Sequence, residues 1–108
     1  MVAPRRFDVW LCRLDPTIGR EISKTRPAVV VSPDEANEAV SGFTMAPMTT
    51  GGFGHPSRVP IHFDGKDGTI VVDQLRCLDR TRLVRRMGHL DEPTRERLLE
   101  TLAAFFAP

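Results

Sequence analysis

Aromatic side chains are scarce in this chain. It has no tyrosine, one tryptophan and six phenylalanines, so that aromatic residues make up 6% of its 108 positions. Proteins that bind single-stranded nucleic acid by stacking successive bases depend on aromatic side chains. We therefore expect any nucleic-acid contact of this chain to depend on hydrogen bonds and groove contacts more than on stacking.

Cysteines and long apolar runs are also few. The chain has two cysteines, Cys12 and Cys77, without metal-ligand spacing, and a single possible disulfide is a weak indication of an oxidising compartment. No segment approaches the length of a membrane span, and the N-terminus lacks the apolar stretch of a signal peptide. We expect one domain, residues 1–108, in the cytoplasm, without a membrane contact, a bound metal or a cofactor.

Neither sign of charge dominates. Lys and Arg total 15 and Asp and Glu total 14, so the net charge of +1 indicates no particular partner. Basic residues nevertheless cluster at 20–26 and 76–86, and acidic residues gather at 34–38 and 91–100. Two interpretations stay open: one face attracts phosphates, or these are ordinary solvated charges.

The pattern of apolar residues predicts short strands over the first two-thirds of the chain. We expect a strand buried on both faces at 27–31, a glycine-rich loop at 49–56 and a turn at 64–68. The other strands are expected at 7–14, 43–48, 58–63, 69–75 and 84–89.

Two helices are predicted. Ser32 is expected to cap a short helix that has Pro33 at its first position and ends near Val40. Asp91 is expected to cap a C-terminal helix whose apolar residues recur every three or four positions, so that the face they form packs against the rest of the domain. These residues are Leu98, Leu99, Leu102, Phe105 and Phe106. Short strands followed by one amphipathic helix favour a mainly-β or α+β domain with a twisted, barrel-like sheet.

Four motifs, in order and at family-like spacing, resemble one known family. They are Asp8-Val9-Trp10-Leu11 followed by Leu14-Asp15-Pro16-Thr17-x-Gly19-x-Glu21; Thr25-Arg26-Pro27-Ala28-Val29-Val30-Val31-Ser32-Pro33; Ala46-Pro47-Met48-Thr49-Thr50; and Val72-Asp73-Gln74-Leu75-Arg76-Cys77-Leu78-Asp79. Together they cover roughly residues 7–106 and resemble the MazF/PemK toxins of type II toxin–antitoxin systems.

The resemblance implies an SH3-like twisted β-barrel with a C-terminal helix, of the CcdB/PemK type, assembled as a homodimer. It implies a sequence-specific, metal-independent endoribonuclease that cleaves single-stranded RNA through attack of a 2′-OH group and is neutralised by a cognate antitoxin. One alternative is a toxin of the same fold that inhibits DNA gyrase without cutting RNA. Another is an RNA-binding module with a degraded site, because Arg20 and Val71 stand where some members have histidine and arginine.

Carried over by position, the family's catalytic arginine corresponds to Arg26 and its catalytic threonine to Thr49. A guanidinium stays charged and can hold two phosphate oxygens, so Arg26 suits stabilisation of the reacting phosphate. The Thr49 hydroxyl suits a hydrogen bond to the same phosphate. Glu21 is the candidate general base and Asp73 is its alternative.

Further residues are candidates for RNA contacts. Phosphates are expected to meet basic side chains at Arg20, Lys24, Arg58 and Arg76. The loop that begins at Thr49 and Thr50, together with Asp73 and Gln74, offers donors and acceptors for the edges of unpaired bases. Thr50 is also the neighbouring alternative to Thr49 as the catalytic threonine.

Overall fold

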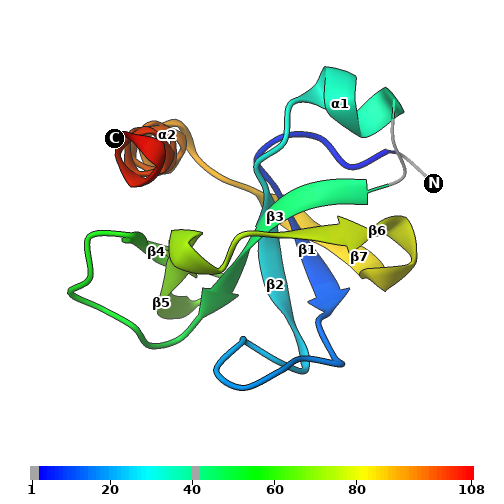
Figure 1. Cartoon of the computed structure of the whole chain (residues 1–108), viewed down its shortest axis with the longest axis horizontal. Coiled ribbons are helices and arrows are strands. Elements are labelled where there is room, and N and C mark those ends of the chain that lie inside the picture. Colours follow the sequence, from blue (N-terminus) through cyan, green and yellow to red (C-terminus); the bar gives the residue numbers. More distant parts are fainter. Residues whose placement is uncertain (1–2, 40–41) are drawn as a thin grey trace.

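A strongly curled antiparallel sheet with one long helix packed against it forms the molecule (Figure 1). The computed structural model describes residues 3–39 and 42–108. The strands are β1 (Asp8–Arg13), β2 (Thr25–Val30), β3 (Gly42–Thr49), β4 (Arg58–Phe63), β5 (Lys66–Val71), β6 (Arg76–Asp79) and β7 (Leu83–His89). The helices are α1 (Asp34–Ala39) and α2 (Glu92–Phe106), with 3-10 turns η1 (Val72–Gln74) and η2 (Arg80–Arg82).

The sheet bends around β3, which pairs with three other strands. The strand order is β4-β5-β3-β2-β1-β7, and β6 pairs with the first half of β3. The middle of β3 pairs with β2 as far as Ala28 and Pro47, whereas its end pairs with β5 at Met48 and Thr49. Because β3 leaves β2 after Pro47, the ends of these two strands diverge and an opening forms between them.

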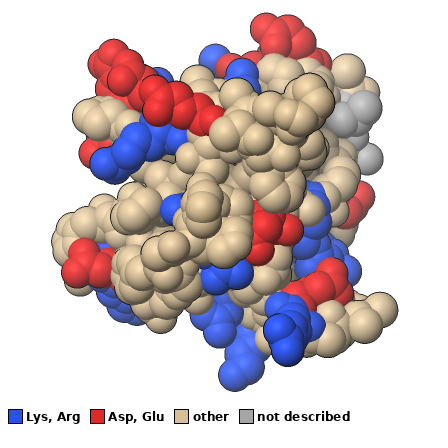
Figure 2. All heavy atoms as spheres, turned by 60° about the vertical axis from the view of Figure 1, so that its left-hand side comes forward, with Lys and Arg blue, Asp and Glu red and all other residues tan. Residues whose placement is uncertain are grey.

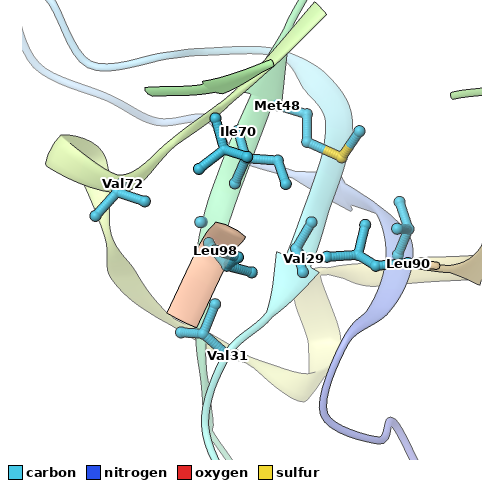
Figure 3. Packing of buried hydrophobic residues seen from close by; sticks show 10 residues of the cluster. Val29, Val31, Met48, Ile70, Val72, Leu90 and Leu98 are labelled. Carbon is cyan, nitrogen blue, oxygen red and sulfur yellow. The ribbon is translucent and has the colours of Figure 1, made fainter. Parts of the chain in front are cut away.

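The apolar core lies on both sides of β2. Val29 and Val31 belong to a cluster that Leu98 of α2 covers (Figure 3), and Ala28 and Val30 belong to a second cluster around Phe43. Alternate residues of a strand face opposite sides of a sheet. The continuous apolar run in this segment is thus buried on both faces, which confirms the sequence prediction.

Helix α2 begins as predicted and packs less of its surface than predicted. The Asp91 carboxylate accepts a hydrogen bond from the Thr94 N–H at 2.9 Å, which satisfies one free donor of the first turn. Leu98 is buried and Leu102 packs against the core. The expectation that the whole apolar set packs down is wrong, because Leu99, Phe105 and Phe106 are exposed.

Several predicted boundaries need correction. The strand expected at 69–75 ends at Val71, where η1 turns the chain before β6, a strand that the sequence pattern did not predict. The turn expected at 64–68 is a two-residue hairpin turn at Asp64 and Gly65, both with positive φ.

Helix α1 also differs from its prediction at its start. It begins at Asp34, and the Ser32 hydroxyl donates to the Asn37 side chain at 2.6 Å. The helix end expected near Val40 lies outside the described residues. Within residues 3–39 and 42–108, no helix combines the length and hydropathy needed to cross a membrane.

Candidate functional site

The main cleft opens where β2 and β3 diverge and has a volume of about 450 Å³. Its walls come from the ends of β2 and β3, from the β4–β5 hairpin and from β7. Arg26 lies on the diverging end of β2 and Thr49 on that of β3, and both line the cleft. The structure therefore brings these two predicted residues to one site, together with Lys24 and Thr50.

Arg26 is half-buried and held by its own loop. Its Nε donates to the carbonyl oxygen of Ser23 at 2.9 Å. Its two terminal nitrogens have no hydrogen-bond partner among the residues that the structure describes. A guanidinium fixed through Nε keeps its outer edge available for a bidentate contact with an anion such as a phosphate.

Thr49 is positioned by the neighbouring strand β5. It pairs with Thr69, whose hydroxyl donates to the carbonyl oxygen of Gly51 at 2.6 Å and so fixes the start of the glycine-rich loop. A Cβ on Gly68 would collide with the carbonyl oxygen of Thr49. Glycine at 68 is therefore a condition for the close approach of β5 to this residue.

The main cleft combines charged and apolar side chains. Four cationic side chains line it against two carboxylates, which gives a formal excess of two positive charges. They are Lys24, Arg26, Lys66 and Arg85 against Asp64 and Asp67. On the face shown in Figure 2, Lys and Arg predominate at the lower edge and the largest acidic group lies at the upper edge. This asymmetry favours the approach of a phosphate chain to part of the surface.

A separate small pocket of about 200 Å³ contains other predicted site residues. Its lining is Glu21, Ile22, Pro47, Asp73, Gln74, Leu75 and Arg76, and the main cleft shares none of these residues. Glu21 accepts a hydrogen bond from the N–H of Ile18 at 2.6 Å within its own loop. The structure therefore does not place Glu21 in the same cavity as Arg26 and Thr49.

Asp73 is engaged on both carboxylate oxygens. Oδ1 accepts from the Ser57 hydroxyl at 2.9 Å and from Arg58 Nε at 3.2 Å, and Oδ2 accepts from the other end of that guanidinium at 3.3 Å. Burial alone would raise the pKa of Asp73, but the hydrogen bonds from Arg58 and Ser57 outweigh it and hold this pKa below its ordinary value. A carboxylate with a lowered pKa is a weaker base.

Gln74 fastens the β1–β2 loop (residues 14–24) to η1. Its side-chain oxygen accepts from the N–H of Ile22 at 2.7 Å, and its nitrogen donates to the carbonyl oxygen of Arg20 at 3.4 Å. Arg76 likewise donates to the carbonyl oxygen of Leu14 at 3.2 Å. Three predicted RNA contacts, Arg58, Gln74 and Arg76, thus also hold the protein's own loops and turn.

Sequence reasoning missed much of the cleft wall. Lys66 and Arg85 line it together with Arg26, and Phe63 and Met87 contribute apolar surface. Arg85 falls in the basic stretch 76–86, which was the available signal. The others come from strands that reach the cleft through the curl of the sheet. Within the described part of the chain, no group of three or more His, Cys, Asp or Glu side chains is arranged to hold a metal ion.

The chain matches one protein family over nearly its whole length. The family described as "PemK-like, MazF-like toxin of type II toxin-antitoxin system" matches residues 5–106. The Endoribonuclease MazF of Staphylococcus epidermidis is 31% identical over 96 residues, which cover 82% of this chain and 78% of that protein.

Solved structures confirm the predicted fold class. The crystal structure of MazF from Deinococcus radiodurans superposes with a TM-score of 0.85 at 23% identity, over 97% of both chains. A MazE–MazF crystal structure from the same organism superposes with a TM-score of 0.71 at 26% identity, again over 97% of both chains. The match over nearly the whole chain, on a curled sheet closed by a C-terminal helix, shows that this chain belongs to the PemK-like, MazF-like toxins of type II toxin–antitoxin systems.

Proposed function

We propose that this chain is a sequence-specific endoribonuclease that cuts single-stranded RNA without a metal ion, and that Arg26 and Thr49 are its catalytic residues. The observation that carries the proposal is their position on two diverging strand ends in one cleft with an excess of positive charge. The S. epidermidis relative, named Endoribonuclease MazF, supports the activity.

In the proposed reaction, the 2′-oxygen of a ribose attacks the adjacent phosphorus atom. The 2′-O–P bond forms, the P–O5′ bond breaks, and the products are a 2′,3′-cyclic phosphate and a 5′-hydroxyl. Negative charge builds on the non-bridging phosphate oxygens during this step. The terminal nitrogens of Arg26 hold these oxygens, and the Thr49 hydroxyl donates to one of them.

Glu21 is proposed as the general base that takes the 2′-OH proton. Its competitor Asp73 has a pKa below its ordinary value and is bound on both oxygens by Ser57 and Arg58, which makes it a weaker base than an unbound aspartate. Because Glu21 lines the small pocket, this role requires its carboxylate to come within hydrogen-bond reach of the 2′-OH beside the phosphate that Arg26 holds. A proton from a second group of the site goes to the leaving 5′-oxygen, so that one proton is taken from the RNA and one is given back in each cut.

RNA binding is proposed for the predicted residues around both cavities. Lys24 lines the main cleft and Arg20 is exposed on the β1–β2 loop, where they suit phosphate contacts, and Thr50, which also lines the main cleft, suits a base edge. The remaining candidates lie at or beside the small pocket and suit base edges or phosphates: Arg58, Asp73, Gln74 and Arg76. A homodimer and a cognate antitoxin are proposed partners, and the related MazE–MazF structure supports the second.

The test is incubation of the purified protein with a long unstructured RNA in excess chelator. Discrete fragments with 5′-hydroxyl and 2′,3′-cyclic phosphate ends are expected. Intact RNA, or cutting that requires an added divalent ion, would contradict the proposal. DNA gyrase supercoiling is measured in parallel. Intact RNA together with inhibited gyrase would favour the alternative function, a toxin of the same fold that inhibits gyrase.

A further inference from the structure

The main cleft is more apolar than a phosphate group requires. Its charged lining residues are exposed apart from the half-buried Arg26, whereas its apolar lining residues Leu11, Met48, Ile61, Phe63 and Met87 are buried or half-buried and are called the apolar floor here. Alkyl and thioether groups offer no hydrogen bonds to an anion. The ligand part that covers this floor must therefore be less polar than the phosphate that Arg26 and Thr49 would hold.

The floor is built from strands that the curl of the sheet brings together. Leu11 pairs with Pro27 on one side and with Arg85 on the other, so these three residues form a row across β2, β1 and β7. Ile61 and Phe63 are alternate residues of β4 and approach from the hairpin. A Cβ on Gly88 would lie 3.3 Å from the Phe63 ring, so glycine there allows the hairpin to close tightly over β7.

Resting on the proposed function, we propose that this apolar floor binds one unpaired nucleobase of a nucleotide beside the scissile phosphate, and thereby contributes to the choice of cleavage site. A base is joined through its ribose to the phosphate held at Arg26. Binding of that phosphate therefore also brings the base close to the apolar floor. Its flat faces are apolar, and they pack on thioether and aromatic side chains such as Met87 and Phe63.

The size and the charge of the cleft agree with this occupant. Its volume of about 450 Å³ lies within the range of about 300–1,000 Å³ that is typical of small-ligand pockets. The formal excess of two positive charges in the cleft lining favours a ligand whose backbone is anionic. An apolar side chain of the antitoxin is the competing occupant, and in that case removal of a base from the RNA would not make cleavage depend on the floor residues.

The test combines a change in the RNA with a change in the protein. Once a cleavage site is mapped, synthetic oligonucleotides carry an abasic ribose on the 5′ or the 3′ side of the scissile bond, and kcat/KM is measured. One abasic position is expected to reduce kcat/KM of the unchanged protein about tenfold or more, since packing of one base contributes on that scale. In Met87→Ala and Ile61→Ala the same change should cost less than about threefold, because the contact is already lost.

Val84→Ala is the matched control, since Val84 is an exposed apolar residue of β7 that does not line the cleft. It should show the same abasic penalty as the unchanged protein. Equal abasic penalties in all variants would overturn this inference and leave the nuclease proposal standing, and would assign the floor to another occupant such as the antitoxin. An unchanged protein that cuts no RNA would overturn both.

A second measurement avoids any dependence on the folding of variants. A photoreactive base is placed beside the scissile bond of an oligonucleotide made uncleavable by a 2′-deoxy sugar at the cut. Irradiation of its complex with the unchanged protein should produce adducts on peptides that contain Ile61, Phe63 or Met87. Adducts confined to peptides of the small pocket, such as the one around Gln74, would overturn the inference.

Discussion

Gly68 lies directly against Thr49, and the contact is so close that any side chain at position 68 would strike the carbonyl oxygen of Thr49. The two residues belong to β5 and β3, which pair only near this end of β3 in the part of the chain that the structure describes. The position of the proposed catalytic hydroxyl therefore depends on the absence of a side chain in the neighbouring strand.

Gly68→Ala should reduce RNA cleavage although it removes no functional group. The new Cβ forces the Thr49 backbone to move, and displacement of a reacting group by about 1 Å can cost on the order of a hundredfold in rate. We expect kcat to fall by about tenfold or more with a smaller change in KM. Gly51→Ala is the control, because a Cβ there meets nothing within 4 Å; equal activities in the two variants would contradict this explanation.

Arg26→Ala should reduce kcat/KM by about 10²–10³, the range for loss of one preorganised charge-stabilising donor. Arg26→Lys should recover little of this loss, because an ammonium group cannot make the bidentate contact of a guanidinium. The melting temperature of both variants should stay near that of the unchanged protein. Arg5→Ala, which removes an exposed arginine paired with Asp34, serves as the control. Full cutting by Arg26→Ala would remove the principal residue of the proposed mechanism.

Thr49→Val should reduce cleavage and Thr49→Ser should retain most of it. Valine keeps the shape of threonine and removes the hydroxyl, whereas serine keeps the hydroxyl that donates to the phosphate. The expected loss in kcat for Thr49→Val is about tenfold to a hundredfold. The same pair of substitutions at Thr50 decides the register: a larger loss at 50 than at 49 would make Thr50 the catalytic threonine.

A lower pH should weaken the hydrogen bonds by which Asp73 holds η1 to Ser57 and Arg58. Its pKa in the folded protein is lowered, so its stabilising contribution is present above the unfolded pKa of about 3.9 and is lost as pH falls through the lower folded value. Asp73→Asn should lower the melting temperature at pH 7, and this difference should shrink as the pH falls below about 4.

The control for this prediction is Asp64→Asn. The carboxylate of Asp64 makes no hydrogen bond among the described residues. At pH 7 this substitution should lower the melting temperature less than Asp73→Asn does, because it breaks none of the hydrogen bonds to Ser57 and Arg58. A difference between Asp73→Asn and the unchanged protein that persists at pH 2 would show that the ionised carboxylate is not the source of the stabilisation.

The local pattern of apolar residues predicted most strands but did not predict the turn at η1. The run 69–75 has the composition of a strand, and nothing in its sequence signals that the chain turns after Val71. The turn is held by side-chain contacts with distant segments: Gln74 bonds the loop at Ile22, and Asp73 bonds Ser57 and Arg58. Such long-range contacts leave no periodic signal in a single sequence.

The residues of the candidate site were likewise predicted only in part. Arg26 and Thr49 were identified because their motifs resemble a family, and the structure places both in one cleft. Glu21 was assigned because it matches an acidic position of the same family in the loop before Arg26, yet it lines the small pocket. Lys66 and Met87 were missed because their place in the cleft wall depends on how far the sheet curls, which no short motif encodes.

The fastening of the β1–β2 loop by Gln74 has a consequence for how this chain tolerates change. Both bonds go to main-chain atoms, the N–H of residue 22 and the carbonyl of residue 20, so they are indifferent to which side chains the loop carries. Among natural residues, only proline at position 22 would delete a partner. The outward-facing side chains of the loop can therefore change during evolution while the two hydrogen bonds from Gln74 stay the same.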